Sequence, residues 1–458
     1  MIVATEARLA GTLAAAPPRS GNRRILHAAV AVSAAGVVVK IAATGKEIAI
    51  AGLYGRSDAM DAFLAAFLIP NLLINLIAES MNQALIPTLI RVRVQQGQVR
   101  GRQLFSSSML ATCLMLAGAS AVMAALARVF FPLIASNFSS SKFDLAVRLF
   151  YVLLPCVLLG GIASNCTAVL NMVDRFALPA LAPIVVPVAV VATTLALHRA
   201  MGIWALAWGT VAGTAIQACL LAAGTHAHGY GVRLRWYGRD EATREVAHQF
   251  GPVLLGSVVA SGGLLVDQAM AAMLPAGSVS SLAFAGRFVG VVVSLLAGAI
   301  SSALAPYFSE LVARRDWLAC RATLRAWTLR AALVSTPIAL ALIAGAHLLV
   351  RMTLQHGVFA ARDTRAVAPA LAMYAIQIPF FAVSRVYYRF VVAMRRSDLV
   401  FYCGALNLVL DIVLNLVLMR AMGVAGIALA TSLWTIGTWA FLRFWACRLL
   451  AKASEVRP

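Results

Sequence analysis

Long runs of apolar residues, separated by short polar stretches, recur along the whole chain. A helix needs about 20 residues to cross the apolar core of a bilayer, and twelve runs suit such a helix. They lie near residues 27–44, 60–88, 106–133, 145–170, 177–197, 202–223, 249–274, 280–306, 327–350, 366–390, 400–420 and 424–446. Transmembrane β-strands would show about ten alternating residues, which no run here sustains. The pattern predicts an all-α polytopic membrane protein with about 12 transmembrane helices.

Composition strengthens this prediction. Of the 458 residues, 62% are hydrophobic and 12% are charged, whereas soluble domains carry about 25% charged residues. A soluble enzyme with one anchor and a disordered chain are both excluded, because apolar residues dominate throughout.

Charge indicates how the chain is oriented. The 38 basic and 17 acidic residues leave a formal net charge of +21. Most basic residues fall at the two termini and on alternate connections between the apolar runs. On those connections they are Arg91, Arg93, Arg100, Arg102, Arg175, Arg233, Arg235, Arg239, Arg244, Arg314, Arg315, Arg321, Arg325, Arg395 and Arg396. Loops rich in Lys and Arg stay in the cytoplasm, so both termini are predicted to be cytoplasmic. Nucleic-acid binding is not favoured, because the charge is spread over many short loops.

Two short segments recur at nearly one spacing. Ala84–Pro87 (ALIP) returns as Ala303–Pro306 (ALAP), 219 residues later, and the Met-Gly pair at Gly202 returns at Gly423, 221 residues later. Chance matching of small apolar residues is the alternative explanation. A duplication of six helices preserves orientation, so the two lobes would be parallel repeats around a central cavity, a common transporter design.

The predicted organisation has five parts. They are a cytoplasmic N-terminal arm (1–26), an N-lobe of helices 1–6 (27–224), a cytoplasmic basic linker (225–248), a C-lobe of helices 7–12 (249–446) and a cytoplasmic tail (447–458).

Charged and polar residues within the spans are candidates for substrate binding, because such groups are costly in lipid and usually face a cavity. The candidates are Lys40, Lys46, Glu47, Asp61, Asn75, Glu79 and Arg287. Arg385 and Arg389 lie one turn apart near the end of the tenth span. An excess of cationic groups suits an anionic, phosphate-bearing headgroup. The alternative is that these groups neutralise one another or extend to the interface.

A second group of residues offers oxygen ligands. Asp267, Asn407, Asp411 and Thr431 lie in the seventh, eleventh and twelfth spans. Carboxylate, amide and hydroxyl oxygens suit a hard cation, so this is a candidate Na⁺ site. Protonated carboxyls that hydrogen-bond between helices are the alternative, and the coupling ion could be Na⁺ or H⁺. No Walker A, GxSxG or HExxH motif occurs and no cysteines form a CxxC pair, so a transporter rather than an enzyme is predicted, with no further cofactor.

Several motifs resemble one known family. They are Asp61-Ala62-Phe63, Ile69-Pro70-Asn71-Leu72-Leu73, Ala78-Glu79, Gln83-Ala84-Leu85-Ile86-Pro87, Leu170-Asn171, Asp174-Arg175-Phe176, Gly277-Ser278-Val279-Ser280, His356-Gly357-Val358-Phe359 and Gly426-Ile427-Ala428-Leu429-Ala430-Thr431-Ser432. Over residues 27–446 the chain resembles the MurJ (MviN) lipid II flippases of the multidrug/oligosaccharidyl-lipid/polysaccharide exporter superfamily.

This resemblance implies alternating access by two lobes around a cationic cavity. The substrate would be a polyprenyl-pyrophosphate-linked saccharide, moved from the inner to the outer leaflet of the bacterial inner membrane. Family arginines correspond to Lys40, Lys46 and Arg287, and some members hold Na⁺ where Asp267, Asn407, Asp411 and Thr431 stand. Cell-envelope synthesis proteins are expected partners.

The chain departs from the family pattern in two ways. Ile74 stands where an arginine is expected, and typical members carry two further helices. Because of these departures, two other substrate classes remain as alternatives. One is an exopolysaccharide or O-antigen lipid intermediate, and the other, less favoured, is a small molecule exported with a cation. An inactive scaffold is a further alternative.

Overall fold

The computed structural model describes residues 19–135, 137–238 and 240–455. Its side chains are described from Ala35 onward, except at positions 133, 260, 397 and 455. Most of the predicted arm (1–26) and the end of the predicted tail (447–458) therefore lie outside the described residues.

The described chain is helical, and its elements follow one another with short turns. They are α2 (Arg19–Tyr54), α3 (Asp58–Leu73), the π-helix η1 (Ile74–Glu79), α4 (Ser80–Gln96), α5 (Gln98–Ala125), α6 (Ala127–Ile134), α7 (Ser140–Leu153), α8 (Pro155–Met172), α9 (Ala177–Leu181), the 3₁₀ turn η2 (Ala182–Ile184), α10 (Val185–Met201), α11 (Ile203–Ala227), α12 (Glu241–Ala272), α13 (Ser278–Ala313), α14 (Trp317–Leu354), α15 (Ala361–Ala375), α16 (Gln377–Ala393), α17 (Ser397–Met422) and α18 (Val424–Glu455).

Eleven helical segments in the described part of the chain are long and apolar enough to cross a membrane. Helix α2, with 36 residues, precedes them. Several spans combine two or three pieces, as α3, η1 and α4 do between Asp58 and Gln96. The prediction of an all-α polytopic membrane protein is confirmed.

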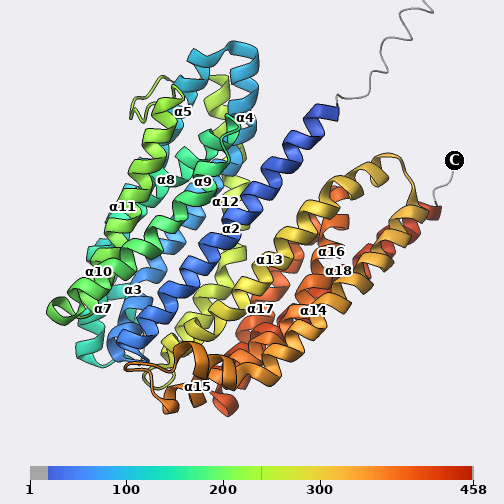
Figure 1. Ribbon diagram of the computed structural model, residues 1–458. Helices are drawn as coiled ribbons and strands as arrows, with labels where there is room; N and C mark the ends of the chain where they lie inside the picture. The colour runs from blue at the N-terminus through green and yellow to red at the C-terminus, as the bar shows by residue number, and fades with distance from the viewer. Residues whose placement is uncertain (1–18, 136, 239, 456–458) are drawn as a thin grey trace, which may run out of the picture.

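The helices form two groups (Figure 1). Helices α3–α11 pack mainly on one another, as do α13–α18, and α2 packs mainly on α9 and α10. We call these groups the N-lobe, with α2, and the C-lobe. Helix α12 packs on α17 of the C-lobe and equally on α4 of the N-lobe. It therefore links the lobes along its length.

The turns of the molecule lie at two ends. We call the end with the turns at residues 97, 228–238, 314–316 and 395–396 the arginine-rich end, and the end with the turns at 55–57, 202, 273–277, 355–360 and 423 the opposite end. One hydrophobic cluster at the opposite end contains residues of both lobes, such as Phe150 and Phe284. At the arginine-rich end each lobe has its own cluster, around Phe105 in the N-lobe and Phe308 in the C-lobe. The lobes thus share a core at one end and are separate at the other.

The two glycines of the sequence repeat have the same local structure. Gly202 ends α10 with φ 55° and ψ −131°, and Gly423 ends α17 with φ 58° and ψ −132°. Each donates its N–H to the carbonyl four residues earlier, at His198 and Met419. Side chains rarely tolerate this backbone conformation, so the repeated glycine is required by the turn.

Candidate functional site

Asp61 lies at the opposite end, in a contact between the lobes. Its side chain is almost fully buried. One carboxylate oxygen accepts hydrogen bonds from the Gly277 N–H at 2.7 Å and the Lys142 ammonium at 2.9 Å, and the other accepts from the Ser280 N–H at 2.8 Å. The charge thereby caps the N-terminus of α13, where the helix dipole favours an anion. Asp61 therefore joins the two lobes and lies apart from the other predicted binding residues.

Further bonds strengthen this contact. The Arg56 guanidinium donates to the Gly277 carbonyl at 3.1 Å and lies 3.5 Å from the Asp363 carboxylate. The Val358 N–H donates to the Gly52 carbonyl at 2.8 Å. We call these contacts, together with those of Asp61, the latch. The latch holds the opposite end closed.

A charged cluster bridges the lobes within the membrane-spanning part. Glu47 on α2 accepts from the Lys46 ammonium at 2.9 Å and lies 3.3 Å from the Arg287 guanidinium on α13. Glu47 is largely buried, whereas the Arg287 side chain is 59% exposed. An exposed guanidinium in a span is tolerated where it faces water rather than lipid. The structure thus brings Lys46, Glu47 and Arg287 together with one surplus positive charge.

The other predicted binding residues form no ion pair or hydrogen bond with this cluster in the described part of the chain. Lys40 and Asn75 are exposed, on α2 and η1. Glu79, at the end of η1, accepts a hydrogen bond from Ser164 at 2.8 Å. A π-helix changes the direction of the side chains after it and is frequent at functional sites. Ile74, in the position where the family resemblance predicts an arginine, begins this π-helix.

Arg385 and Arg389 on α16 are half-buried among aromatic rings. The Arg385 guanidinium lies 4.6 Å from the Phe381 ring centre, and Arg389 lies 5.7 Å from that of Tyr388. Among the described residues neither has a carboxylate within 4.0 Å. Aromatic faces attract a cation without neutralising it, so both arginines retain a full charge for an anion.

The predicted oxygen cluster forms with one change of member. Asn415 donates to Asp267 at 2.8 Å and to Asp411 at 3.1 Å, and Thr431 lies 3.3 Å from Asp267. Asn407 instead accepts from Thr438 at 2.9 Å and does not reach the carboxylates. Asn415 is the residue that sequence reasoning missed. Its spacing of four from Asp411 was a signal that Asn407 shares, since residues four apart on either side share a helix face.

Two buried oxygens of this cluster have no hydrogen-bond partner. They are Asp411 Oδ2 and Asn415 Oδ1. A buried acceptor without a partner is costly and calls for an explanation such as a bound ion. The donor set fits a hard monovalent cation, because it combines two carboxylates with amide and hydroxyl oxygens.

At the arginine-rich end, polar contacts connect the N-lobe to α12. Arg91 pairs with Glu245 at this end, and the Ser80 and Ser257 hydroxyls are 2.9 Å apart near the middle of the two spans. Asp240 caps α12 by accepting from the Thr243 N–H at 2.9 Å. Partial burial raises the pKa of Asp240, but the hydrogen bonds from Thr243 and the charge of Arg100 outweigh it and lower that pKa overall. These contacts hold α12 against the N-lobe.

Comparisons with known proteins agree with this architecture. The model of the family described as "Lipid II flippase MurJ" matches residues 50–455. A protein of Burkholderia cenocepacia named lipid II flippase MurJ is 29% identical over 362 residues, 77% of this chain and 70% of that protein. A solved lipid II flippase MurJ in an inward closed conformation superimposes with a TM-score of 0.79 at 20% identity, covering 93% of this chain and 90% of that one. An inward-facing multidrug resistance MATE transporter of the MOP superfamily gives 0.78 at 11% identity, covering 94% and 100%.

Proposed function

Because the chain belongs to the lipid II flippase MurJ family, we propose that it is a flippase that moves lipid II from the inner to the outer leaflet of the bacterial inner membrane. The family match over residues 50–455 carries the proposal. The substrate is a polyprenyl-pyrophosphate-linked saccharide, and the protein is a transporter rather than an enzyme. Proteins of cell-envelope synthesis remain predicted partners.

Lys46 and Arg287 are the proposed pyrophosphate ligands. They contact the same Glu47 oxygen, at 2.9 and 3.3 Å. A pyrophosphate carries more charge than one carboxylate, and hydrogen bonds between ionised partners are strong. The substrate would therefore replace Glu47 as the partner of both cations, with Lys40 and the Arg385–Arg389 pair adding positive charge.

Alternating access follows from the difference between the two ends. The positive-inside rule places the arginine-rich end and both termini in the cytoplasm. The latch then closes the outer end, and the separate lobe cores at the inner end leave entry from the cytoplasm. Export requires the latch to open and the lobes to approach at the inner end. Each negative charge moved outward gains about 2.3 kcal/mol per 100 mV of membrane potential, so the potential favours export.

A Na⁺ ion coupled to transport is the second part of the proposal. Asp267, Asp411, Asn415 and Thr431 would hold it, and the unpartnered oxygens of Asp411 and Asn415 support this assignment. The positive charge of the ion would offset the negative charge of the two carboxylates, Asp267 and Asp411. These residues come from α12, α17 and α18, so they would connect the position of α12 to the ion gradient.

The decisive experiment is complementation of a bacterium depleted of MurJ. The wild-type chain should restore growth, whereas Lys46→Ala and Arg287→Ala should abolish rescue and Lys40→Ala should weaken it. Arg199→Ala is the control, because Arg199 is exposed at the opposite end.

Each outcome has a distinct meaning. Failure of the wild-type chain, with the protein present in the membrane, would contradict lipid II as the substrate and favour an exopolysaccharide or O-antigen lipid intermediate. Full rescue by Lys46→Ala, Arg287→Ala and Lys40→Ala would contradict the assigned headgroup site.

A further inference from the structure

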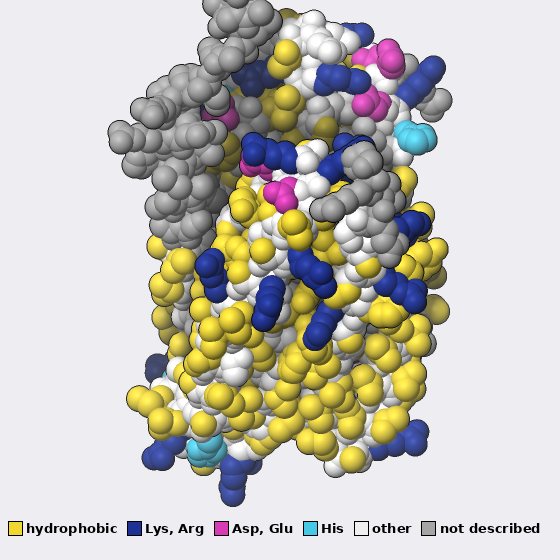
Figure 2. Space-filling view, turned by 90° about the vertical axis from the view of Figure 1, so that its right-hand side faces the viewer, with side chains coloured by type: hydrophobic (Ala, Val, Ile, Leu, Met, Phe, Trp, Pro, Cys, Tyr) yellow, Lys and Arg dark blue, Asp and Glu magenta, His cyan; other side chains and the backbone are white. Residues whose placement is uncertain are grey.

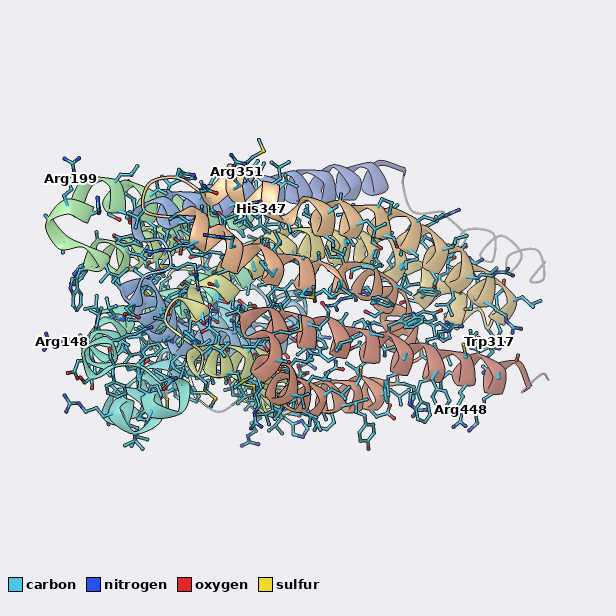
Figure 3. The ribbon with its side chains drawn as sticks, turned by 90° about the horizontal axis from the view of Figure 1, so that it is seen from below. Arg148, Arg199, Trp317, His347, Arg351 and Arg448 are labelled. Carbon is cyan, nitrogen blue, oxygen red and sulfur yellow. The ribbon has the colours of Figure 1, made fainter. Side chains whose placement is uncertain are left out.

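A large groove lies outside the region between the lobes, on the C-lobe at the arginine-rich end. It has a volume of about 1260 Å³ and lies between α14 and α18, with Tyr387 of α16 at its base. Leu318, Leu329 and Leu450 are among its apolar walls. Figure 3 places Trp317, which also lines the groove, at the same end as Arg448 of α18, with Arg351 of α14 toward the other end.

The groove is strongly basic. Arg315, Arg321, Arg325 and Arg443 line it, against the single carboxylate of Asp316. Asp316 is engaged in accepting from the Ala319 N–H at 2.9 Å, at the start of α14. Within the described part of the chain, none of the four arginines has a carboxylate within 4.0 Å. The groove therefore has unbalanced positive charge.

A buried polar atom also lacks a partner there. The hydroxyl oxygen of Thr328, which lines the groove, is buried and has no hydrogen-bond partner. Most buried hydroxyls in proteins are paired, so this one is available to a ligand oxygen. It stands one turn from Arg325 and thus lies on the same face of α14.

The arginines lie at the depth of lipid headgroups. Arg330 and Arg351 flank twenty residues of α14 that contain no Lys, Arg, Asp or Glu. Twenty helical residues rise about 30 Å, the thickness of the bilayer core. Arg325 and Arg321 precede Arg330 by about 8 and 14 Å along the helix, which places Arg325 at the headgroups and Arg321 just outside them, within reach of its long side chain. On the face of the molecule drawn in Figure 2, Lys and Arg lie over the upper and middle parts and again at the lower edge, with a largely hydrophobic surface between them.

We propose that this groove binds an anionic glycerophospholipid from the leaflet at the arginine-rich end. The phosphodiester lies between Arg321, Arg325 and Arg443 and accepts from Thr328, while the acyl chains follow the apolar walls. A phosphodiester complements the excess of guanidinium groups, and arginine binds phosphate oxygens in a forked geometry. A ligand with acyl chains also explains why Leu329 and Ala332 continue the groove on the membrane side of Arg325. The site is independent of lipid II transport.

The test measures lipid binding to the full-length protein. Native mass spectrometry from detergent would follow titrations with dioleoyl phosphatidylglycerol and with dioleoyl phosphatidylcholine. The wild-type protein should retain one phosphatidylglycerol more tightly than any phosphatidylcholine. A basic residue near anionic lipid contributes about a fivefold change in affinity, so Arg321→Gln with Arg325→Gln should weaken binding about 25-fold.

A matched double variant is the control. Arg148→Gln with Arg199→Gln removes the same charge from exposed positions at the opposite end and should retain wild-type binding (Figure 3). Arg443→Lys keeps the charge and loses only the forked geometry, so it should weaken binding by less than about fivefold, which separates loss of charge from misfolding. Ala332→Phe, which fills the groove while keeping every arginine, should also weaken binding.

Three results would overturn the proposal. They are equal retention of the two lipids by the wild-type protein, equal loss in the control double variant, and displacement of the lipid by glycerol phosphate at matched concentration. The last result would show a site for a soluble anion. None of these results bears on the complementation test, so this proposal and the proposed function can fail separately.

Discussion

In the N-lobe, the helix that ends at Gly202 carries Val190 and Thr194, both buried. In the C-lobe, the helix that ends at Gly423 carries Asp411 and Asn415 at the corresponding positions, 221 residues later. The turns at the two glycines agree within a few degrees. The same backbone therefore carries Val190 and Thr194 in one lobe and two members of a polar cluster in the other.

The same contrast recurs one helix later. Thr210 of α11 donates to the Leu206 carbonyl of its own helix. Its counterpart Thr431 on α18 contacts Asp267 as well as the carbonyl of Ile427. Similar helix packing thus carries different side chains in the two lobes, because Val190 and Thr194 stand where Asp411 and Asn415 of the proposed ion cluster stand in the C-lobe. The predictions below test this division of roles.

The largest effect is expected where the lobes join. Asp61→Asn removes the carboxylate that accepts from the Gly277 and Ser280 N–H groups of the other lobe. It also breaks the buried ion pair with Lys142 of the same lobe, a loss of about 3–5 kcal/mol. The lobes should separate at the opposite end. Spin labels at Arg199→Cys and Arg351→Cys, with Cys219 and Cys447 changed to Ser, would report the longer distance.

Asp58→Asn is the matched control for Asp61. Asp58 also pairs with Lys142, at 2.7 Å, but its side chain is 60% exposed. Exposed ion pairs contribute about 0–1 kcal/mol, so this variant should change the distance little. Equal effects of the two variants would show that the latch does not depend on the buried carboxylate.

The next effect concerns the ion cluster of the C-lobe. Asp411→Val introduces the N-lobe residue, and the chain should lose its stabilisation by Na⁺. An ion present at 100 times its Kd stabilises a protein by about 2.7 kcal/mol. Thermal unfolding in NaCl and in choline chloride should therefore differ for the wild-type protein and coincide for the variant.

Thr194→Val is the N-lobe counterpart of that test. It changes a buried residue outside the cluster and should leave the response to Na⁺ intact. A wild-type protein that unfolds at one temperature in both salts would contradict the sodium site.

A smaller and symmetric effect is expected at the repeated turns. No atom lies within 4 Å of a Cβ added at Gly202 or at Gly423, so alanine there introduces backbone strain alone. Each substitution should lower the free energy of unfolding by about 1–3 kcal/mol, and by similar amounts. Gly118→Ala, in a helix with open space, is the control. If the two substitutions lower the free energy of unfolding by clearly different amounts, the two turns do not depend on the same backbone conformation.

The smallest effect distinguishes the two threonines. Thr210→Val loses only a bond within its helix and should change the free energy of unfolding by less than about 0.5 kcal/mol. Thr431→Val removes a partner of Asp267, for which a loss of about 1 kcal/mol is typical. Chemical denaturation of both variants would measure the difference. Equal values would remove Thr431 from the cluster.

Most of the fold could be predicted from the sequence. The apolar runs predicted the spans. The repeated Met-Gly pair at Gly202 and Gly423 adopts the same turn conformation in both lobes. Lys46, Glu47 and Arg287 were predicted together and lie together. The cost of placing polar groups in lipid applies to each segment independently, so these features could be read without knowledge of the helix packing.

The partners of Asp61 and Asp411 could not be predicted in this way. Asp61 follows the helix cap at Ser57, which placed it near an end, but Gly277 and Ser280 come from the other lobe. Asn407 and Asn415 each lie four residues from Asp411. The choice between them depends on the height of Asp267 on α12.

The sequence alone therefore determined the membrane class, the succession of spans, the duplicated turn and the distribution of basic loops. Each of these depends on short-range hydropathy, charge or backbone preference. Tertiary structure alone decided that Asp61 belongs to a latch, that Asn415 rather than Asn407 meets Asp267, and that four arginines share one groove. The physical reason is that side-chain pairing depends on the relative height and rotation of helices, which packing fixes only when the whole chain is folded.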